Sequence, residues 1–340
     1  MLRNLPVVVS VPEKRLVYCG YNCGQILTQA NPPDPDPLEE FRLFAIMATW
    51  MEADVVAATV SNALTQGCER VYLADNNSPD ETVKVALDAG ATLAANYATP
   101  HFDEHMHRVM LNALVAFLSL QEGADHIWWL YLDADEFPHG PQGMTLGAYL
   151  RTLDRRFRIV GSRVFFHYPA DIPHYASGRH PLDFQPLCEE IHVPNVCPAQ
   201  HWKHPLQRYD RYGPFIASAM GAHSITTGRV GESALEPPVP IFTHHFQYRD
   251  EEVTRRRLAL LSFDPATGQS RTRLMDAGER GGSMHRRHRQ VDAVYGRRWE
   301  QISIRAGNDA PGVHPRPWRE LVSDDDARVA RWYGDGAGSA

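Results

Sequence analysis

The sequence Ile127-Trp128-Trp129-Leu130-Tyr131-Leu132-Asp133-Ala134-Asp135-Glu136-Phe137 joins a strongly apolar run to three carboxylates. The apolar part is long enough for a buried strand, and folding alone does not explain its abrupt acidic end. Because side chains at positions i and i+2 point to the same side of an extended chain, Asp133 and Asp135 can present oxygens to one hard divalent cation. The stretch therefore predicts a strand that ends in a metal site.

The composition is that of a soluble, mildly acidic globular protein. The 340 residues are 43% hydrophobic and 22% charged, with a net charge of -7, which argues against a nucleic-acid-binding protein. No segment approaches the roughly 20 apolar residues that cross a membrane, and there is no N-terminal secretory pattern. We therefore expect a cytoplasmic protein without a membrane span.

The five cysteines are an odd number, and the absence of a secretory pattern favours reduced thiols. A structural zinc site with some of the histidines is the alternative. The spacings do not match the usual zinc knuckles, so free thiols are the favoured interpretation. The possible zinc ligands among the cysteines are Cys19, Cys23, Cys188 and Cys197.

Strand and helix patterns alternate between residues 41 and 132. Strands are expected at 41–49, 70–74, 91–95 and 127–132, and helices at 52–66, 80–89 and 103–120. This alternation predicts an α/β fold, with a doubly wound, mostly parallel sheet and helices on both faces.

The rest of the chain is divided by composition. Prolines at alternating positions in 31–37 exclude regular structure and mark the end of an N-terminal extension, residues 1–40. We expect a catalytic domain at 41–250 and a C-terminal helical and mobile region at 251–340. Within the catalytic domain, 161–245 lacks clear periodicity and is expected to supply acceptor-binding loops and a few strands.

Acidic residues follow three of the predicted strands, at Glu52, Asp75 and Asp133. Because parallel strands end at the same edge of a sheet, these clusters are expected to meet in one crevice. Asp75 comes directly after a buried strand, which favours a functional role. Asp80 or Ser78 is better explained as the cap of the following helix.

These clusters together resemble the family 2-like glycosyltransferases of the GT-A fold, and in particular the subgroup whose metal motif is Asp-x-Asp-Glu-Phe. The resemblance rests on Glu52, on 71–82 and on 129–137, and it covers roughly residues 41–250. A further piece is His245-Phe246 with Arg249, where the subgroup has a strand that ends in His, followed by an aromatic and a basic residue. The usual Asn-Glu pair after the first strand is here Met51-Glu52, which departs from the pattern.

The resemblance implies a sugar transferase that uses a nucleotide diphosphate sugar as donor. A divalent cation, Mn²⁺ or Mg²⁺, would neutralise the charge that develops on the leaving diphosphate. The implied metal ligands are Asp133, Asp135 and His245. The implied substrate contacts are Glu52, Asp75, Asn76, Arg108, Asp133 and Glu136, with Asn112 as a further candidate on the helix of Arg108.

The acceptor side is less marked in the sequence. The absence of a membrane segment favours a small-molecule acceptor, such as a natural product or metabolite. An inverting transferase needs a base, and the catalytic candidates are Glu190, Asp210 and His223, with Glu189 beside them. His223 follows a β-prone run and is a candidate for base, acceptor contact or metal ligand.

Two other functions remain as alternatives. A sugar nucleotidyltransferase also pairs carboxylates with a metal, but it carries a glycine-rich basic loop, and residues 41–54 contain neither glycine nor lysine. A catalytically silent carbohydrate- or nucleotide-sugar-binding protein would keep the fold, although it would have no need for Asp133 and Asp135 together.

Overall fold

The computed structural model describes residues 8–11, 14–17, 25–29, 34–98, 104–169, 180–190, 202–219, 222, 224–227, 233–262, 291–301 and 315–318. The first half of the described chain contains β1 (Val8–Val11), β2 (Lys14–Val17), β3 (Gln25–Gln29), β4 (Arg42–Thr49), α1 (Val56–Thr65), β5 (Arg70–Asp75), α2 (Thr82–Asp88), β6 (Thr92–Asn96), α3 (Glu104–Glu122), β7 (His126–Asp133), β8 (Glu136–His139), η1 (Pro141–Gly143) and α4 (Leu146–Leu150). The second half contains β9 (Ile159–Tyr168), η2 (Pro181–Asp183), β10 (Leu187–Glu190), β11 (Trp202–Asp210), β12 (Ile216–Ala219), β13 (Ser224–Thr227), β14 (Ser233–Glu236), β15 (Ile241–His245), α5 (Glu251–Ser262), η4 (Trp299–Gln301) and β16 (Arg316–Pro317).

A ten-stranded sheet forms the centre of the described chain, in the order β16-β10-β9-β11-β7-β4-β5-β6, with β15 against β9 and β8. The pairings β7-β4, β4-β5, β5-β6 and β9-β15 are parallel, whereas β11 is antiparallel to both β7 and β9. Taken with the remaining antiparallel pairings, seven of the ten strands run in one direction. The predicted α/β fold with a mostly parallel sheet is confirmed.

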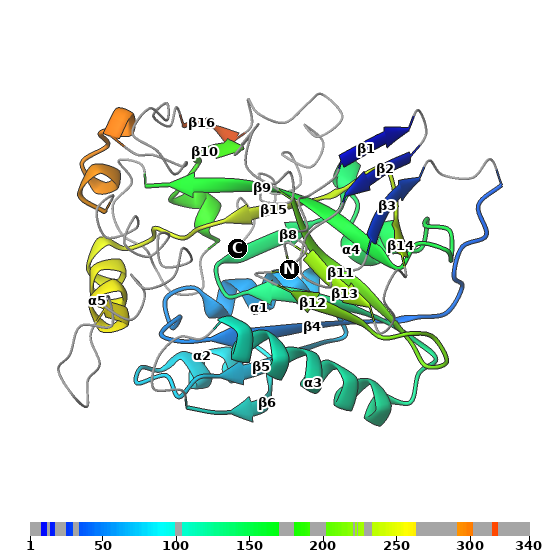
Figure 1. The fold of residues 1–340 in the computed structure, drawn as a ribbon. Helices are drawn as coiled ribbons and strands as arrows, with labels where there is room; N and C mark the ends of the chain where they lie inside the picture. Colours follow the sequence, from blue (N-terminus) through cyan, green and yellow to red (C-terminus); the bar gives the residue numbers. More distant parts are fainter. Residues whose placement is uncertain are drawn as a thin grey trace, which may run out of the picture.

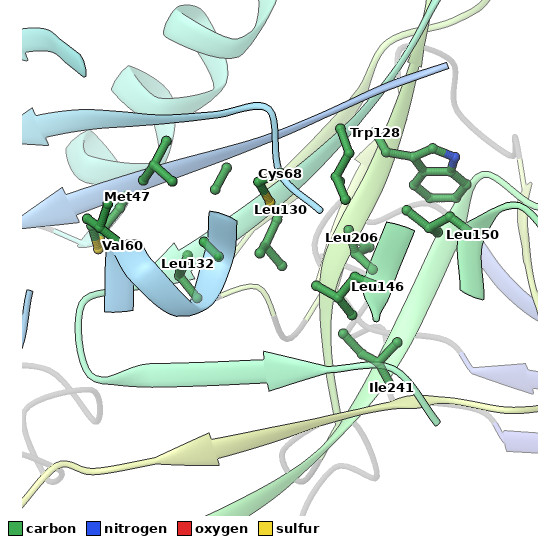
Figure 2. Packing of buried hydrophobic residues seen from close by; sticks show 14 of the residues in the cluster. Met47, Val60, Cys68, Trp128, Leu130, Leu132, Leu146, Leu150, Leu206 and Ile241 are labelled. Atoms are coloured by element: carbon green, nitrogen blue, oxygen red, sulfur yellow. The ribbon is translucent and has the colours of Figure 1, made fainter. Parts of the chain in front are cut away.

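Helices cover both faces of this sheet, as predicted (Figure 1). Alternate residues of β4 point to opposite faces, so that Leu43, Ala45 and Met47 pack in one cluster and Phe44 and Ile46 in another. The first cluster takes in residues of α1, α2 and α4, and the second takes in residues of α3. Figure 2 shows the first cluster, in which Leu206 of β11 and Ile241 of β15 continue the core beyond the β7 side chains Trp128, Leu130 and Leu132.

Helix α1 begins later than the sequence pattern suggests, at Val56 instead of 52. Residues 51–55 form a turn in which the carbonyl of Glu52 accepts from the backbone N–H groups of Val55 and Val56. Met51 has a φ of 57°, a left-handed conformation that Asn adopts more readily than Met. This is the position at which the resemblance leads one to expect Asn.

The segment 161–245 contains more regular structure than expected, because its described residues lie mostly in strands β9 to β15. One of these strands, β14, pairs with β3 in a separate four-stranded sheet, in the order β1-β2-β3-β14. This small sheet lies at the upper right of Figure 1, and α5 lies at the opposite side. None of the helices in the described ranges is long and apolar enough to span a bilayer.

Candidate active site

The acidic strand ends meet at the carboxyl edge of the parallel strands. Asp133, the last residue of β7, pairs with Ala48 of β4, and Asp75, the last residue of β5, pairs with Thr49 of the same strand. Since neighbouring strands lie about 4.8 Å apart, the two aspartates are separated by roughly 10 Å across the end of β4. The predicted edge of the sheet thus carries carboxylates on both sides of its central strand.

Asp135 and His245 come together because β8 and β15 pair directly after the turn at Asp135. Glu136 lies opposite His245 in this pairing, and the backbone N–H of Phe246 donates to the carbonyl of Asp135 at 2.8 Å. As a result, Nε2 of His245 lies 3.4 Å from Oδ1 of Asp135, and its Nδ1 lies 3.8 Å from Oε1 of Glu136. The site brings together two residues that the sequence proposed as metal ligands.

The third proposed ligand, Asp133, is held by two cations of the protein itself. Nζ of Lys203, on β11, lies 2.9 Å from Oδ2 of Asp133 and also contacts Glu136. Nη2 of Arg108, on α3, lies 3.6 Å from Oδ1 of Asp133. Arg108 therefore lies at this edge, where the resemblance places it, whereas no sequence pattern predicts Lys203 there.

A second ion-pair network surrounds Arg249, whose side chain is buried. Its guanidinium contacts Asp54 at 2.7 Å, Glu52 at 2.5 Å and Asp135 at 3.4 Å. Arg257, on α5, also contacts Glu52. Asp54, which precedes the first turn of α1, is thus a partner of Arg249.

These surroundings change the pKa values of the carboxyl groups in different directions. Burial alone would raise the pKa of Asp133, but Lys203 and Arg108 hold it well below its usual range. The pKa of Asp135 is likewise low, since His245 and Arg249 outweigh burial. For Glu52, burial dominates over Arg257 and Arg249 and raises the pKa to about 7.

The donor set at Asp135 and His245 suits a divalent cation. Adjacent ligands of an octahedral ion with bonds of about 2.1 Å lie about 3 Å apart, which is close to the 3.4 Å between the carboxylate oxygen and the imidazole nitrogen. Nδ1 of His245 is buried and has no hydrogen-bond partner among the described residues. No cluster of three or more His, Cys, Asp or Glu side chains in the described ranges is arranged around a common cation, so further ligands would have to come from substrate and water.

Asp75 is fully buried, and its carboxylate is occupied by its own loop. It accepts hydrogen bonds from Thr49 Oγ1 at 2.8 Å, from Ser78 Oγ at 2.6 Å and from the Ser78 backbone N–H at 2.7 Å. Ser78 is therefore a partner of Asp75 and not a cap of α2. Asp80 accepts from the backbone N–H of Thr82, the first residue of α2, although the N-cap position itself is Glu81. Asn76 donates its backbone N–H to the carbonyl of Thr49, which keeps this loop beside the end of β4.

The candidate Asn112 ties α3 to β12. Its amide exchanges hydrogen bonds with the backbone of Ser218, at 2.8 and 2.9 Å, and its Oδ1 also accepts from Tyr131. These contacts account for the place of its side chain between helix and sheet without a ligand.

Asp210, one of the three candidate bases, does not lie at the acidic edge. Asp210 pairs with His126 at the start of β7, so it lies at the opposite edge of the sheet, more than about 20 Å along β7 from Asp133. There it contacts Arg208, Arg158 and His126. The physical reason is that β11 runs antiparallel to β7, so the end of β11 lies at the beginning of β7.

Glu190 ends β10 and pairs with Phe165 of β9, which places its backbone two strands from β15. His223 lies outside the described residues.

A row of buried histidines lies behind His245, on the other face of β15. Nδ1 of His244 lies 2.8 Å from Nε2 of His167, and Nε2 of His244 lies 3.2 Å from Nε2 of His139. Burial lowers the pKa of His139 to about 4 and that of His167 to about 3. These neutral rings tie β8, β9 and β15 together and so fix the strand that carries His245.

The comparisons with known proteins give structural neighbours only. No protein-family model matches the sequence, and no curated protein matches it. A mannosyltransferase from Pyrobaculum calidifontis, in complex with GDP-Man and Mn²⁺, is 16% identical over 62% of this chain and 58% of its own, with a TM-score of 0.32. Glucosyl-3-phosphoglycerate synthase from Mycobacterium tuberculosis, in complex with Mg²⁺ and uridine-diphosphate, is 11% identical over 65% of this chain and 78% of its own, with a TM-score of 0.31.

A third solved structure, S. aureus TarS 1–349, is 8% identical over 79% of this chain and 76% of its own, with a TM-score of 0.32. The chain spans only 44% of one M. tuberculosis glucosyl-3-phosphoglycerate synthase structure and 58% of the mannosyltransferase. Because these TM-scores are low, a function has to be inferred from the side chains of the site.

Proposed function

We propose that this protein is a metal-dependent glycosyltransferase of the GT-A, family 2-like type, which moves a sugar from a nucleotide diphosphate sugar to a small-molecule acceptor. The observation that carries the proposal is the pair Asp135 and His245, 3.4 Å apart at the carboxyl edge of the parallel strands. A crevice at this edge is where open α/β sheets bind their ligands. The catalytic domain would be residues 41–250.

The cation site would be formed by Asp135 and His245. A bound Mn²⁺ or Mg²⁺ would supply charge neutralisation for the diphosphate as it leaves the sugar. Hard carboxylate oxygen with one imidazole nitrogen suits Mn²⁺ somewhat better than Mg²⁺. The donor's phosphates and water would complete the coordination.

The protein's own residues would position the donor. Arg108 is buried next to Asp133 and can contact phosphate or a sugar hydroxyl at the same edge. Asp75 and Asn76 would shape the nucleoside side of the crevice through the loop after β5. Because the side chain of Asp75 already accepts three hydrogen bonds, its contribution would be to hold this loop.

Glu52 would stabilise the wall behind the cation. It lies between Arg249 and Arg257, and Arg249 in turn contacts Asp135. This contact can fix the orientation of the proposed metal ligand, as groups next to metal ligands commonly do. Of the proposed bases, Glu190 and His223 remain candidates for the acceptor side.

A catalytically silent nucleotide-sugar-binding protein is the second candidate. It is favoured by the ion pairs of Asp133, because Lys203 and Arg108 already neutralise this carboxylate without a metal. Such a protein would bind the nucleotide sugar without transferring the sugar.

The test is incubation of the purified protein with a panel of UDP-, GDP- and dTDP-sugars, in Mn²⁺ or in EDTA. The proposal predicts release of nucleoside diphosphate from at least one donor in Mn²⁺ and none in EDTA, with loss of the release in Asp135→Asn. Donor binding without release in either buffer would favour the silent binding protein. Absence of both binding and release across the panel would contradict the proposal.

A further inference from the structure

Lys203 is a buried lysine whose position is set by an irregularity of its strand. The register between β11 and β9 shifts between Lys203 and Leu206, where β11 carries one extra residue. Pro205 lies within this β-bulge and cannot donate a ladder hydrogen bond. Bulges of this kind re-aim side chains next to functional sites, and here the bulge, at His204 and Pro205, directly follows Lys203.

The ammonium group of Lys203 lies between two carboxylates. Its side chain is only 7% exposed, and it contacts Asp133 at 2.9 Å and also contacts Glu136, whose side chain is 2% exposed. An unpaired ammonium at this depth would be costly, so both carboxylates are needed to hold the lysine in place.

The two aspartates of the motif consequently have different surroundings. Both oxygens of Asp133 face protein cations, Lys203 at 2.9 Å and Arg108 at 3.6 Å. Asp135 faces a protein cation on one oxygen only, since Arg249 lies 3.4 Å from its Oδ2, whereas its Oδ1 faces an imidazole nitrogen, which can bind a metal ion. A second dication beside Asp133 would have to approach the ammonium group of Lys203 at close range, and like charges at such a separation repel strongly.

We propose that Lys203 is a positioning residue that occupies the cation position between Asp133 and Glu136 and so confines the exchangeable divalent cation to Asp135 and His245. The inference rests on the proposed function only for the presence of a cation at Asp135. It gives each of the three carboxylates of the motif a role: Asp135 binds the divalent cation, and Asp133 and Glu136 hold Lys203.

The inference predicts that removal of Lys203 opens a second cation site. In Lys203→Met, the carboxylates of Asp133 and Glu136 lose the ammonium group between them, and Arg108 remains only at Oδ1 of Asp133. The two freed carboxylate oxygens are a favourable donor pair for Mn²⁺. The number of Mn²⁺ ions bound per chain, measured by electron paramagnetic resonance without any sugar donor, is expected to rise from one to two. Lys203→Arg keeps a cation there and is expected to bind one ion.

The double variant Lys203→Met with Glu136→Gln is the matched control. It removes one of the two donors and should return the count to one. A count in Lys203→Met that equals that of the native protein would overturn the inference, as would two ions bound by the native protein. If the native protein binds no Mn²⁺ and Lys203→Met binds one, the cation of the proposed function is absent while the role of Lys203 is supported.

Failure of Lys203→Met to fold is also informative. A divalent cation should then bind Asp133 and Glu136 in place of Lys203 and restore folding. Refolding is therefore expected in MnCl₂ but not in NaCl of equal ionic strength. Refolding in neither salt would contradict the inference.

Discussion

Nε2 of His245 lies 3.4 Å from Oδ1 of Asp135, although the two residues belong to different strands and are far apart in the chain. Their proximity follows from the pairing of β8 with β15 directly after the turn that carries Asp135. Buried histidines on the other face of β15 hold that strand in place. The geometry of the proposed cation site is thus built by the sheet itself.

Arg249 is predicted to be a major contributor to stability, because it is the shared partner of three carboxylates. Replacement by Met would leave Asp54, Asp135 and Glu52 without this partner in a buried place, and we expect a loss of roughly 3–5 kcal/mol in the free energy of unfolding. Urea unfolding measures it. Arg255→Met is the control: this arginine is exposed and pairs with Glu251 and Asp292, so the expected loss is below about 1 kcal/mol. Equal losses in the two variants would refute the prediction.

Asp75→Ala is expected to destabilise the protein by roughly 2–4 kcal/mol, since three hydrogen bonds to a buried carboxylate are lost. The loop after β5 should also lose its order. Protection of the Ser78 and Thr82 amides from hydrogen exchange is the second readout, with the exposed Asp125→Ala as control. Native stability and native protection in Asp75→Ala would show that the carboxylate does not hold the loop.

Glu52 predicts a specific dependence of stability on pH. Burial raises its pKa in the folded protein to about 7, against a usual 4.5, so the folded state binds the proton more tightly between these values. The contribution of Glu52 to the free energy of unfolding is therefore full below about pH 4.5 and decreases as the pH rises towards 7.

Glu52→Gln removes this term. The stability of the native protein relative to the variant should fall by an amount on the order of 1–3 kcal/mol between pH 4.5 and 7.5. Unfolding of both proteins in urea across this range measures the difference. A difference that stays constant, or grows with pH, would mean that Glu52 is ionised throughout.

Asp210 is predicted to affect stability but not sugar transfer. It lies at the opposite edge of the sheet and pairs with Arg158, Arg208 and His126. We expect Asp210→Asn to lower the free energy of unfolding by roughly 1–3 kcal/mol and to leave kcat/KM for the donor unchanged. A large fall in kcat with an unchanged free energy of unfolding would make Asp210 a catalytic candidate again.

Much of the parallel half of the fold could be predicted, because strands and helices between Arg42 and Asp133 have strong periodicity and clear ends. β4 and β7 are apolar on both faces, which identifies strands buried between two layers of helices. The order of strands at the far side could not be predicted in the same way. There, β11 runs antiparallel to β7, and no local sequence pattern predicts that direction.

The site was predictable where a residue and its strand are adjacent in sequence. Asp133 ends β7, Asp135 lies two residues further on, and His245 ends β15, so the strand ends alone point to them. Lys203 could not be found in this way, because its position depends on the bulge at Pro205 and on pairing with a distant strand. The only local signal was a lysine between Trp202 and His204, in a chain that has only two other lysines, Lys14 and Lys84, and otherwise uses arginine.

The most direct test of the proposed function is the affinity for a nucleoside diphosphate, measured by calorimetry with Mn²⁺ and with EDTA. The native protein is expected to bind at least one of UDP, GDP and dTDP about tenfold or more tightly in Mn²⁺, a difference of at least about 1.4 kcal/mol. Asp135→Asn should lose this difference, and Asp210→Asn should keep it. Equal affinity of the native protein in Mn²⁺ and EDTA, or a Mn²⁺ effect that survives in Asp135→Asn, would contradict the proposed cation site.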